Sequence, residues 1–425
     1  MNRHKTSSTL RLFGLIVLTL PPMVHGGPML NSMSTASNNT STLLYPETGY
    51  LDDRFGHAVA IDGSWALAGA PRDDDNGLEA GAAYLFLWSN NQWTQKAKLL
   101  AADGEAGDSF GYSVSLSGNT AVIGAVQDDD LGTDSGSAYV FEFDGLSWQQ
   151  TAKLTSLDGQ YIDFFGISIS QSENRILIGA SHHDAVAQSG GSAYVFELQG
   201  DQWVQTARLN AADGGQGDQF GHAVSLSGDR ALIGAHQHQI NGTPVGAAYL
   251  FEWHMGEWVE SAKLSDPNGQ YNDRFGIAVS LDDQQALIGA TGKNLAQGAA
   301  LVFAEDSFGW RHTATLTAMD GTSGDRFGSA VSLLDGSALI GAPYAHDNLT
   351  GAAYQFNQSA QLWQQNQPFQ PDYVGDHVFG RSLDQSTGHI IIGATGMDAS
   401  PSGAGAAHLH QQKLLHTGRL KKSAH

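Results

Sequence analysis

Short apolar runs recur along the chain at nearly constant spacing. The clearest run begins with Phe-Gly and ends with Gly-Ala, as in DRFGHAVAIDGSWALAGAP at residues 53–71. Its phenylalanine returns after 55 residues four times and then after 52 residues twice. A repeat of about 50 residues is typical of a propeller or a related array. The seven copies place this phenylalanine at Phe55, Phe110, Phe165, Phe220, Phe275, Phe327 and Phe379.

Each repeat contains four short segments of strand character. In the first repeat they read HAVAI, ALAGA, AAYLFLW and QWTQKAKLL, and Gly, Asn, Asp and Ser separate them. Such alternating or continuous apolar runs between turn residues predict strands. After the first 26 residues, no window shows a helical period. Four strands in each of seven repeats therefore predict an all-β fold, a seven-bladed β-propeller of four-stranded antiparallel blades.

The constant residues fit the packing of such blades. Small residues such as Gly69 and Ala70 suit inner strands, where backbones crowd toward the axis. Phe55 and its equivalents supply the apolar area that wedges between neighbouring sheets. The sequence repeats because one blade cannot bury both of its faces alone.

The phrase FG…GAP is literal in two repeats and resembles the FG-GAP repeat. Phe55-Gly56 is followed by Gly69-Ala70-Pro71, and Phe327-Gly328 by Gly341-Ala342-Pro343. The family includes the propeller head of integrin α chains, and the resemblance covers about residues 42–410. It implies the propeller fold and an extracellular binding or adhesion role. Integrin α chains carry D-x-D-x-D-G calcium loops between strands 1 and 2; this chain has short turns there, so that calcium role is not implied.

The register of the repeats predicts how the ring closes. The seventh repeat lacks an outer strand, because Thr417 stands where the repeat spacing requires a tryptophan. Leu44 lies eleven residues before Phe55, as Leu99 lies eleven before Phe110. Residues 41–45 are therefore expected to supply the missing strand, so that an N-terminal strand closes the ring.

The first residues of the chain indicate a location outside the cytoplasm. Residues 1–26 carry a basic start and an apolar run too short to span a bilayer, which predicts a cleaved secretory signal; a retained anchor is the alternative. We expect a flexible segment at 27–40, the propeller at 41–410 and a basic tail at 411–425. The chain has no cysteine. Its formal charge of −22 disfavours nucleic-acid binding. After cleavage, we expect a secreted or cell-surface protein without membrane insertion.

Candidate ligand residues lie in the connectors between strands 2 and 3 and between strands 4 and 1. In a meander these connectors share one face, and all variation in repeat length falls there, so function is expected on that face. The connectors between strands 2 and 3 of the first two repeats are acidic. Either these connectors are solvated loops, or they form a weak calcium site, since calcium prefers clustered oxygen ligands. Their acidic residues are Asp73, Asp74, Asp75 and Glu79, then Asp128, Asp129, Asp130 and Asp134.

Tyrosines, paired aspartates and histidines mark the same connectors. Exposed tyrosine rings beside carboxylates would suit sugar stacking, although packing of each ring on its own loop is the alternative. The Asp-Gly-x4-Asp pattern, as in Asp103 and Asp108, predicts carboxylates that cap their own turns. Histidines in three separate blades could bind a transition metal, but the blades hold them apart. The tyrosines are Tyr50, Tyr161, Tyr271 and Tyr373; the histidines are His182, His183, His236, His238 and His346.

These features favour a non-enzymatic binding or adhesion propeller that recognises an extracellular protein or glycan. Two alternatives stay open: a polysaccharide hydrolase or lyase using carboxylates of the same face, and a structural module of a surface assembly. The match of GDSFG at 107–111 to a serine-hydrolase elbow has no strand-to-helix context, so it carries no catalytic prediction.

Overall fold

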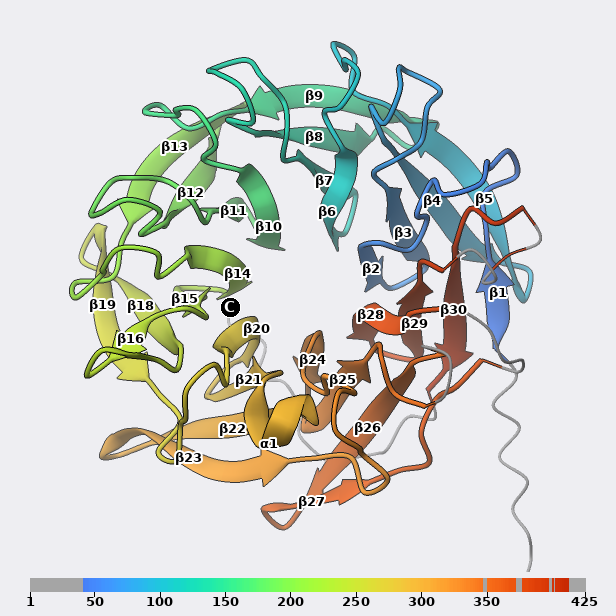
Figure 1. The fold of residues 1–425 in the computed structure, drawn as a ribbon. Helices are drawn as coiled ribbons and strands as arrows, with labels where there is room; N and C mark the ends of the chain where they lie inside the picture. Colours follow the sequence, from blue (N-terminus) through green and yellow to red (C-terminus); the bar gives the residue numbers. More distant parts are fainter. Residues whose placement is uncertain (1–40, 347–349, 372–376, 397–399, 401, 413–425) are drawn as a thin grey trace, which may run out of the picture. The chain divides into compact units, whose positions relative to one another are not determined.

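The strands of the chain form seven four-stranded antiparallel sheets, arranged as blades around a common axis (Figure 1). The computed structural model describes residues 41–346, 350–371, 377–396, 400 and 402–412. In blades 1 to 6 the strands follow one another in the order of the sequence, from the axis outward, and in blade 7 the N-terminal strand takes the outermost place. The predicted seven-bladed propeller is thereby confirmed. The predicted signal, the 27–40 segment and all of the tail beyond residue 412 lie outside the described residues.

The first four blades have these bounds. Blade 1 contains β2 (Val59–Asp62), β3 (Trp65–Ala70), β4 (Ala82–Ser89) and β5 (Gln92–Leu99). Blade 2 contains β6 (Phe110–Ser117), β7 (Thr120–Ala125), β8 (Ser137–Phe143) and β9 (Trp148–Leu154). Blade 3 contains β10 (Phe165–Ser172), β11 (Arg175–Ala180), β12 (Ser192–Gln199) and β13 (Gln202–Leu209). Blade 4 contains β14 (Phe220–Ser227), β15 (Arg230–Ala235), β18 (Ala247–His254) and β19 (Glu257–Leu264).

The last three blades continue the pattern. Blade 5 contains β20 (Phe275–Asp282), β21 (Gln285–Ala290), β22 (Ala299–Asp306) and β23 (Gly309–Leu316). Blade 6 contains β24 (Val331–Leu334), β25 (Ser337–Ala342), β26 (Ala352–Ser359) and β27 (Leu362–Gln365). Blade 7 contains β28 (Phe379–Ser386), β29 (His389–Ala394) and β30 (Ala406–Gln411), with β1 (Thr42–Leu44) beside β30.

The hydrophobic core lies between neighbouring blades. One cluster joins Leu67 and Leu85 of blade 1 to Phe110 and Tyr139 of blade 2. The ring of Phe110 meets that of Tyr139 edge-on, with centroids 5.4 Å apart. All seven phenylalanines of the Phe-Gly pairs are at most 1 % exposed. The predicted wedge role of these phenylalanines is confirmed, since each buries its ring between two sheets.

The two constant glycines of each repeat meet across the boundary between blades. A Cβ on Gly69 would lie 2.0 Å from the carbonyl oxygen of Gly111 in the next blade. Gly111 itself has a φ of +93°, a conformation that favours glycine. The crowding that excludes side chains therefore comes mainly from the approach of the next blade, which refines the expectation of crowding at the axis.

The seventh blade packs against the first, and the N-terminal strand lies at its outer edge. The hydroxyl of Ser382 donates a hydrogen bond of 2.8 Å to the carbonyl of Gly56. The amide of Ile61 donates one of 2.9 Å to the Asp384 carboxylate. In the outer part of the blade, β1 pairs with β30 in antiparallel register, with Leu44 opposite Ala407. Leu44 is 4 % exposed, so this short strand adds buried apolar area to the last sheet.

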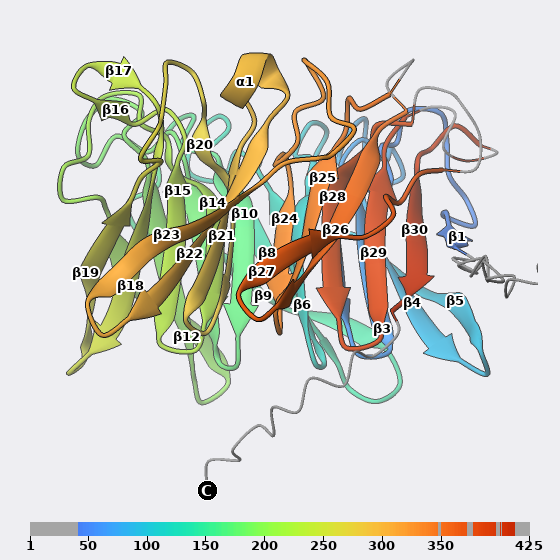
Figure 2. The same ribbon diagram turned by 90° about the horizontal axis from the view of Figure 1, so that it is seen from below.

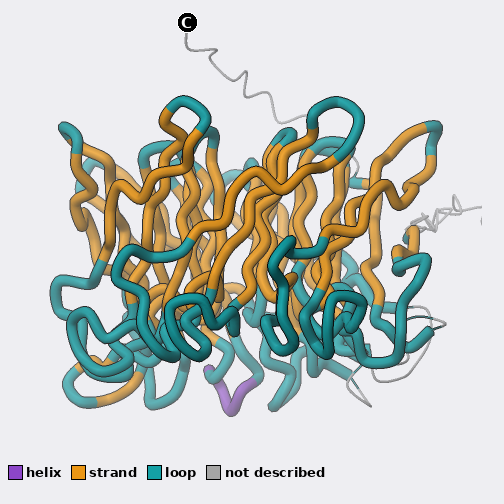
Figure 3. Tube along the Cα trace, turned by 90° about the horizontal axis from the view of Figure 1, so that it is seen from above, coloured by secondary structure: helices purple, strands orange, loops and turns teal. Residues whose placement is uncertain are grey.

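The two faces of the propeller differ sharply (Figures 2 and 3). One face carries the long connectors between strands 2 and 3 and between strands 4 and 1; we call it the loop face. It includes the hairpin β16 (Gln239–Ile240) and β17 (Thr243–Pro244) and the single turn α1 (Lys293–Ala296). The other, the hairpin face, carries short turns. The predicted sharing of one face by the variable connectors is confirmed. Among the described residues, no helix is long and apolar enough to span a membrane.

Candidate functional site

A pocket of about 320 Å³ opens at the centre of the loop face. Every blade contributes to its wall through the same position, the residue that follows Phe-Gly. The whole ring therefore forms the pocket, and each blade supplies one lining residue from this position. These residues are His57, Tyr112, Ile167, His222, Ile277, Ser329 and Arg381.

In five of the blades, an irregularity at the start of the inner strand places these side chains. In blade 2, Phe110 pairs with Ala125, and the pairing resumes only at Ser113 with Gly124. Gly111 and Tyr112 therefore have no partner on the second strand. Bulges of this kind redirect side chains at the rims of sheets, and in these blades the residue after Phe-Gly lines the pocket. The same irregularity follows Phe165, Phe220, Phe275 and Phe379.

One side of the pocket carries three guanidinium groups from consecutive blades. Arg274 and Arg326 come directly before the phenylalanines of blades 5 and 6, and Arg381 follows Phe-Gly in blade 7. None of the three forms an ion pair with a described carboxylate. Arg274 donates from Nε to the side-chain oxygen of Asn272 at 3.2 Å. The guanidinium of Arg326 stacks on the ring of Tyr344, 4.7 Å from its centroid.

The histidines of the pocket are held neutral. Burial lowers the pKa of His222 to about 4, with a further contribution from the charges of His182 and Arg274. Burial likewise lowers the pKa of His57 to about 3, helped by the nearby Arg381 and other arginines. The rings of His222 and His236 lie 4.3 Å apart, and a buried nitrogen of His57 has no hydrogen-bond partner in the described structure. Neutral histidines thus offer both a donor and an acceptor here.

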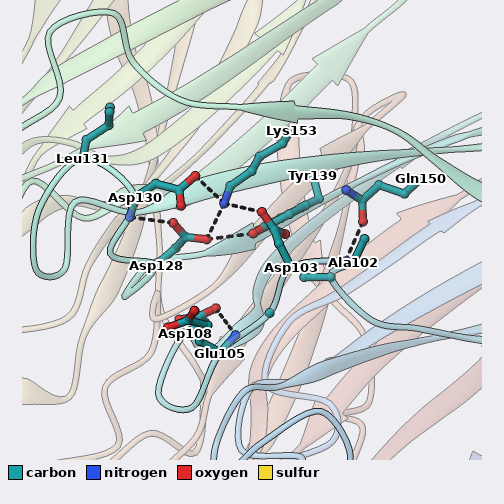
Figure 4. A network of polar contacts seen from close by, with 12 residues as sticks. Ala102, Asp103, Glu105, Asp108, Asp128, Asp130, Leu131, Tyr139, Gln150 and Lys153 are labelled. Carbon is teal, nitrogen blue, oxygen red and sulfur yellow. Dashed lines mark hydrogen bonds and ion pairs between the residues drawn. The ribbon is translucent and has the colours of Figure 1, made fainter.

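The carboxylates of the acidic connector in blade 2 surround a lysine ammonium (Figure 4). The ammonium of Lys153 lies 2.5 Å from Asp130, 2.8 Å from Asp103 and 3.0 Å from Asp128. The hydroxyl of Tyr139 donates to Asp128 at 2.7 Å. Burial alone would lower the pKa of Lys153, but the three carboxylates outweigh it and raise that pKa. We call these five residues the rim network of blade 2.

Blade 1 repeats the arrangement with Lys98. Its ammonium contacts Asp73 at 2.8 Å and Asp75 at 2.5 Å. Asp73 and Asp128 are 1 % and 3 % exposed, so the solvated-loop interpretation is wrong for these two residues. In each case a lysine ammonium stands among the carboxylates that the calcium hypothesis used. Within the described residues, no group of three or more metal-binding side chains is placed to hold an ion.

The remaining acidic residues of the two clusters hold their own loops. Asp74 accepts the amide of Glu79 at 2.7 Å, and Asp129 accepts the amide of Asp134 at 2.8 Å. Glu79 also lies 3.7 Å from Arg72.

In blades 3 and 4, histidines take the place of the buried aspartate. His238 hydrogen-bonds Asp218 at 2.7 Å through Nδ1 and the ammonium of Lys263 at 2.7 Å through Nε2. His183 lies 3.8 Å from Asp158, which accepts the hydroxyl of Tyr194 at 3.0 Å. These two histidines, which the metal hypothesis included, therefore belong to polar networks that correspond in blades 3 and 4 to the rim network of blade 2.

A sequence model of one repeat family matches most of this ring. Its description is FG-GAP repeat, and it matches residues 44–86, 93–141, 148–196, 203–251, 258–303 and 310–356. The chain belongs to the FG-GAP repeat family. The six matched segments end in blade 6, and the seventh blade of this FG-GAP propeller follows from β28–β30 and β1. No curated protein sequence matches the chain.

In this FG-GAP propeller the capping prediction is confirmed for the second aspartate of each pair, whereas Asp103, the first of its pair, binds a basic side chain. The carboxylate of Asp108 accepts the amide of Glu105 at 2.7 Å, three residues earlier. Asp163, Asp218 and Asp325 accept the corresponding amides in their own connectors. Burial is the main reason that the pKa of Asp108 is raised to about 6, and the charge of Asp128 adds to it.

The tyrosines proposed for sugar stacking are exposed and separate. Tyr50, Tyr161 and Tyr271 are 63 %, 66 % and 75 % exposed, which fits ligand contact better than packing on their own loops. They belong to alternate blades, and none lines the central pocket. Tyr50 borders a second hollow of about 260 Å³ together with Tyr45. Tyr373 lies outside the described residues.

Sequence reasoning missed the central pocket, although a signal was present. The third position of Phe-Gly-X changes from blade to blade while the two residues before it are constant. A variable position embedded in a constant motif indicates a side chain released from the packing between blades. The arginines directly before Phe275 and Phe327 are a second signal, because basic residues are scarce in a chain of charge −22.

Proposed function

We propose that this FG-GAP propeller is a secreted or cell-surface, non-enzymatic binding protein that recognises an extracellular protein or glycan through its loop face. One observation carries the proposal: all seven blades converge on one pocket at the centre of that face. Concave sites formed by several elements of a rigid scaffold are where ligands usually bind.

Side chains at the tips of the long connectors support a binding face. Leu51, Leu78 and Leu157 are 67 %, 71 % and 84 % exposed. Tyr161 lies on the connector of Leu157, and Tyr271 on the connector between β19 and β20. Apolar and aromatic tips around a polar centre are the composition of many recognition surfaces.

The hydrolase or lyase alternative requires carboxylates free to act on a sugar. None of the described residues that line the central pocket is acidic. The nearby carboxylates of Asp103, Asp128 and Asp130 bind Lys153, and that of Asp108 caps its own turn. These commitments favour binding without turnover.

Footprinting during ligand binding would test the proposal. The mature protein is first screened on glycan and extracellular-protein arrays, and each ligand found is then used in hydroxyl-radical footprinting. We expect protection of Tyr161 and Tyr271 on the loop face. Met255 and Phe308, which are 92 % and 94 % exposed at hairpin tips, serve as matched controls on the hairpin face. Protection of those two alone, or release of a cleaved glycan, would contradict the proposal.

A further inference from the structure

The central pocket is positively charged although the chain carries a formal charge of −22. Arg274, Arg326 and Arg381 all line it, and no described acidic residue does. Basic groups gathered in a hollow without counterions attract an anion from outside the protein, and low-dielectric walls strengthen that attraction.

We propose that this pocket binds an anionic sugar, with the oxyanion of a uronate, or of a sulfate or phosphate ester, held by the guanidinium groups of Arg274, Arg326 and Arg381. This inference rests on the proposed binding function of the loop face and names its ligand class.

The guanidinium groups retain the donors that such a ligand needs. A guanidinium has five N–H donors, and pairs of them match the two oxygens of a carboxylate or an ester oxyanion. Toward the described residues, Arg274 donates from Nε alone, to Asn272. Arg326 is held by stacking on Tyr344, which leaves its N–H edge available. The arginines thus present charge-assisted hydrogen bonds, which are stronger than neutral ones.

The rest of the wall suits a sugar ring rather than a bare ion. Tyr112, Ile167 and Ile277 supply apolar surface, and the neutral His57 and His222 supply polar groups for hydroxyls. A sugar presents both kinds of surface, because its C–H faces are apolar and its rim is polar. The volume of about 320 Å³ is near the lower end of known ligand pockets, which run from roughly 300 to 1,000 Å³. One sugar residue therefore fits better than a long segment.

The histidines give the inference a signature of its own. Burial lowers the pKa of His222, and the positive charge of Arg274 lowers it further; an anion placed beside that arginine offsets the latter effect. His222 faces His182 and Arg274 and contacts the ring of His236. His57 faces Arg54, Arg72 and Arg381 and contacts the ring of Tyr112. The charged groups that shift the two pKa values are therefore all basic. Binding of the anionic sugar is expected to raise both pKa values, so that proton uptake on binding grows as the pH approaches them.

Calorimetry on the mature protein tests the inference. The probes are galacturonate, N-acetylglucosamine 6-sulfate, inorganic sulfate and, as neutral control, galactose. We expect binding of at least one acidic sugar, with galactose at least roughly tenfold weaker because it lacks the charge-assisted bonds. R274Q/R326Q should lose roughly tenfold or more in affinity. The matched control R311Q, at an arginine 65 % exposed on the outer strand, should not. Measured at pH 5 in two buffers, wild type should take up protons on binding and H222Q fewer.

Each other outcome overturns the inference. Equal binding of galactose, or an affinity unchanged in R274Q/R326Q, would overturn it. Inorganic sulfate binding as tightly as the sulfated sugar would show that the pocket recognises the ion alone. If R274Q/R326Q does not fold by circular dichroism, R274K and R326K keep the charge and are compared instead, with partial retention of affinity expected. A ligand that footprints on the loop face but ignores these variants would leave the proposed function standing.

Discussion

Charge is handled in opposite ways in the rim network and in the central pocket. At the rim, the single ammonium of Lys153 meets three carboxylates, and the hydroxyl of Tyr139 binds one of them. At the centre, Arg274 and Arg326 have no described carboxylate partner. Partly buried charges without counterions cost stability. The ion pairs of the rim network therefore hold the connectors in place. The central pocket instead keeps uncompensated positive charge, which an anionic ligand can neutralise.

The two regions also respond to protons in opposite ways. Burial raises the pKa of Asp108, beside the rim network, to about 6. Burial lowers the pKa of His222, in the central pocket, to about 4. Both groups are thus neutral more readily in the folded protein than in the unfolded chain. Asp108 therefore favours the folded state at low pH, and this contribution is lost as the pH rises through about 6. His222 favours the folded state at higher pH, and this contribution is lost as the pH falls through about 4.

The largest effect is expected from opening the ring, because both regions depend on it. Deletion of residues 27–45 removes β1 and exposes the edge of β30, where Leu44 is buried. We expect a loss of more than about 3 kcal/mol in the free energy of unfolding, or aggregation, since removing one buried leucine side chain alone costs about 2–5 kcal/mol. Urea denaturation and size-exclusion chromatography measure this. Truncation after residue 412 is the control, and an equal loss there would refute the N-terminal closure.

Replacing the central ammonium of the rim network should separate it from the pocket. K153M leaves the buried Asp128 without its cation, so we expect a loss of about 3 kcal/mol in the free energy of unfolding. Anionic-sugar binding should be unchanged. K96M, at an exposed lysine of the neighbouring blade, is the matched control. A K153M protein as stable as K96M would show that the network carries no stability.

The pH dependence of stability should split the two regions. Between pH 3.8 and about 6 the folded state binds more protons than the unfolded chain at Asp108, so its contribution falls as pH rises. At His222, between about pH 4 and 6.5, the folded state binds fewer, so its contribution grows as pH rises.

Two variants isolate these contributions. D108N keeps the cap acceptor and should gain about 2 kcal/mol over wild type at pH 7.5, with little difference at pH 4. H222Q should gain at pH 4 and match wild type at pH 7.5. Unfolding free energies by urea titration at both values decide the matter, and parallel profiles for the two variants would contradict it.

A smaller effect is expected from the exposed tyrosines around the pocket. Y161A and Y271A should each weaken glycan binding by roughly threefold to tenfold, the usual range for one lost aromatic contact. Their melting temperatures should stay near that of wild type, because both rings are exposed. A large drop in melting temperature would instead assign the rings to packing, and Y50A provides a comparison in blade 1.

The smallest effect is expected from calcium. In wild type, the ammonium of Lys153 occupies the centre of the carboxylates, so millimolar calcium should raise the melting temperature by no more than about 2 °C. K153M exposes those oxygens and should respond more strongly. A magnesium titration controls for general screening. A large and calcium-specific shift in wild type would show a site that the lysine does not fill.

The propeller was predictable because its signals are local and repeated. Phe-Gly, Gly-Ala and the spacing to each outer strand recur in register, so seven weak strand patterns reinforce one another. The capping role of Asp108 was predictable for the same reason, since it depends on an amide three residues away.

The candidate site could not be predicted in the same way. The burial of Asp128 depends on Lys153, 25 residues later, and the pocket joins Arg274 to His57 across the ring. Such pairings depend on how far each blade is rotated about the axis, which a repeat spacing does not specify. The bulge after Phe-Gly was equally hidden, because it follows from pairing irregularities such as that between Phe110 and Ser113.

The Phe-Gly bulge gives this architecture a capacity for heritable change. Phe110 and Gly111 make the contacts between blades, while the next residue, Tyr112, lines the central pocket. A point mutation at that third position can alter recognition without disturbing the scaffold, so natural selection can act on binding and on folding separately. A combinatorial library could exploit the same separation by randomising one codon per blade: His57, Tyr112, Ile167, His222, Ile277, Ser329 and Arg381.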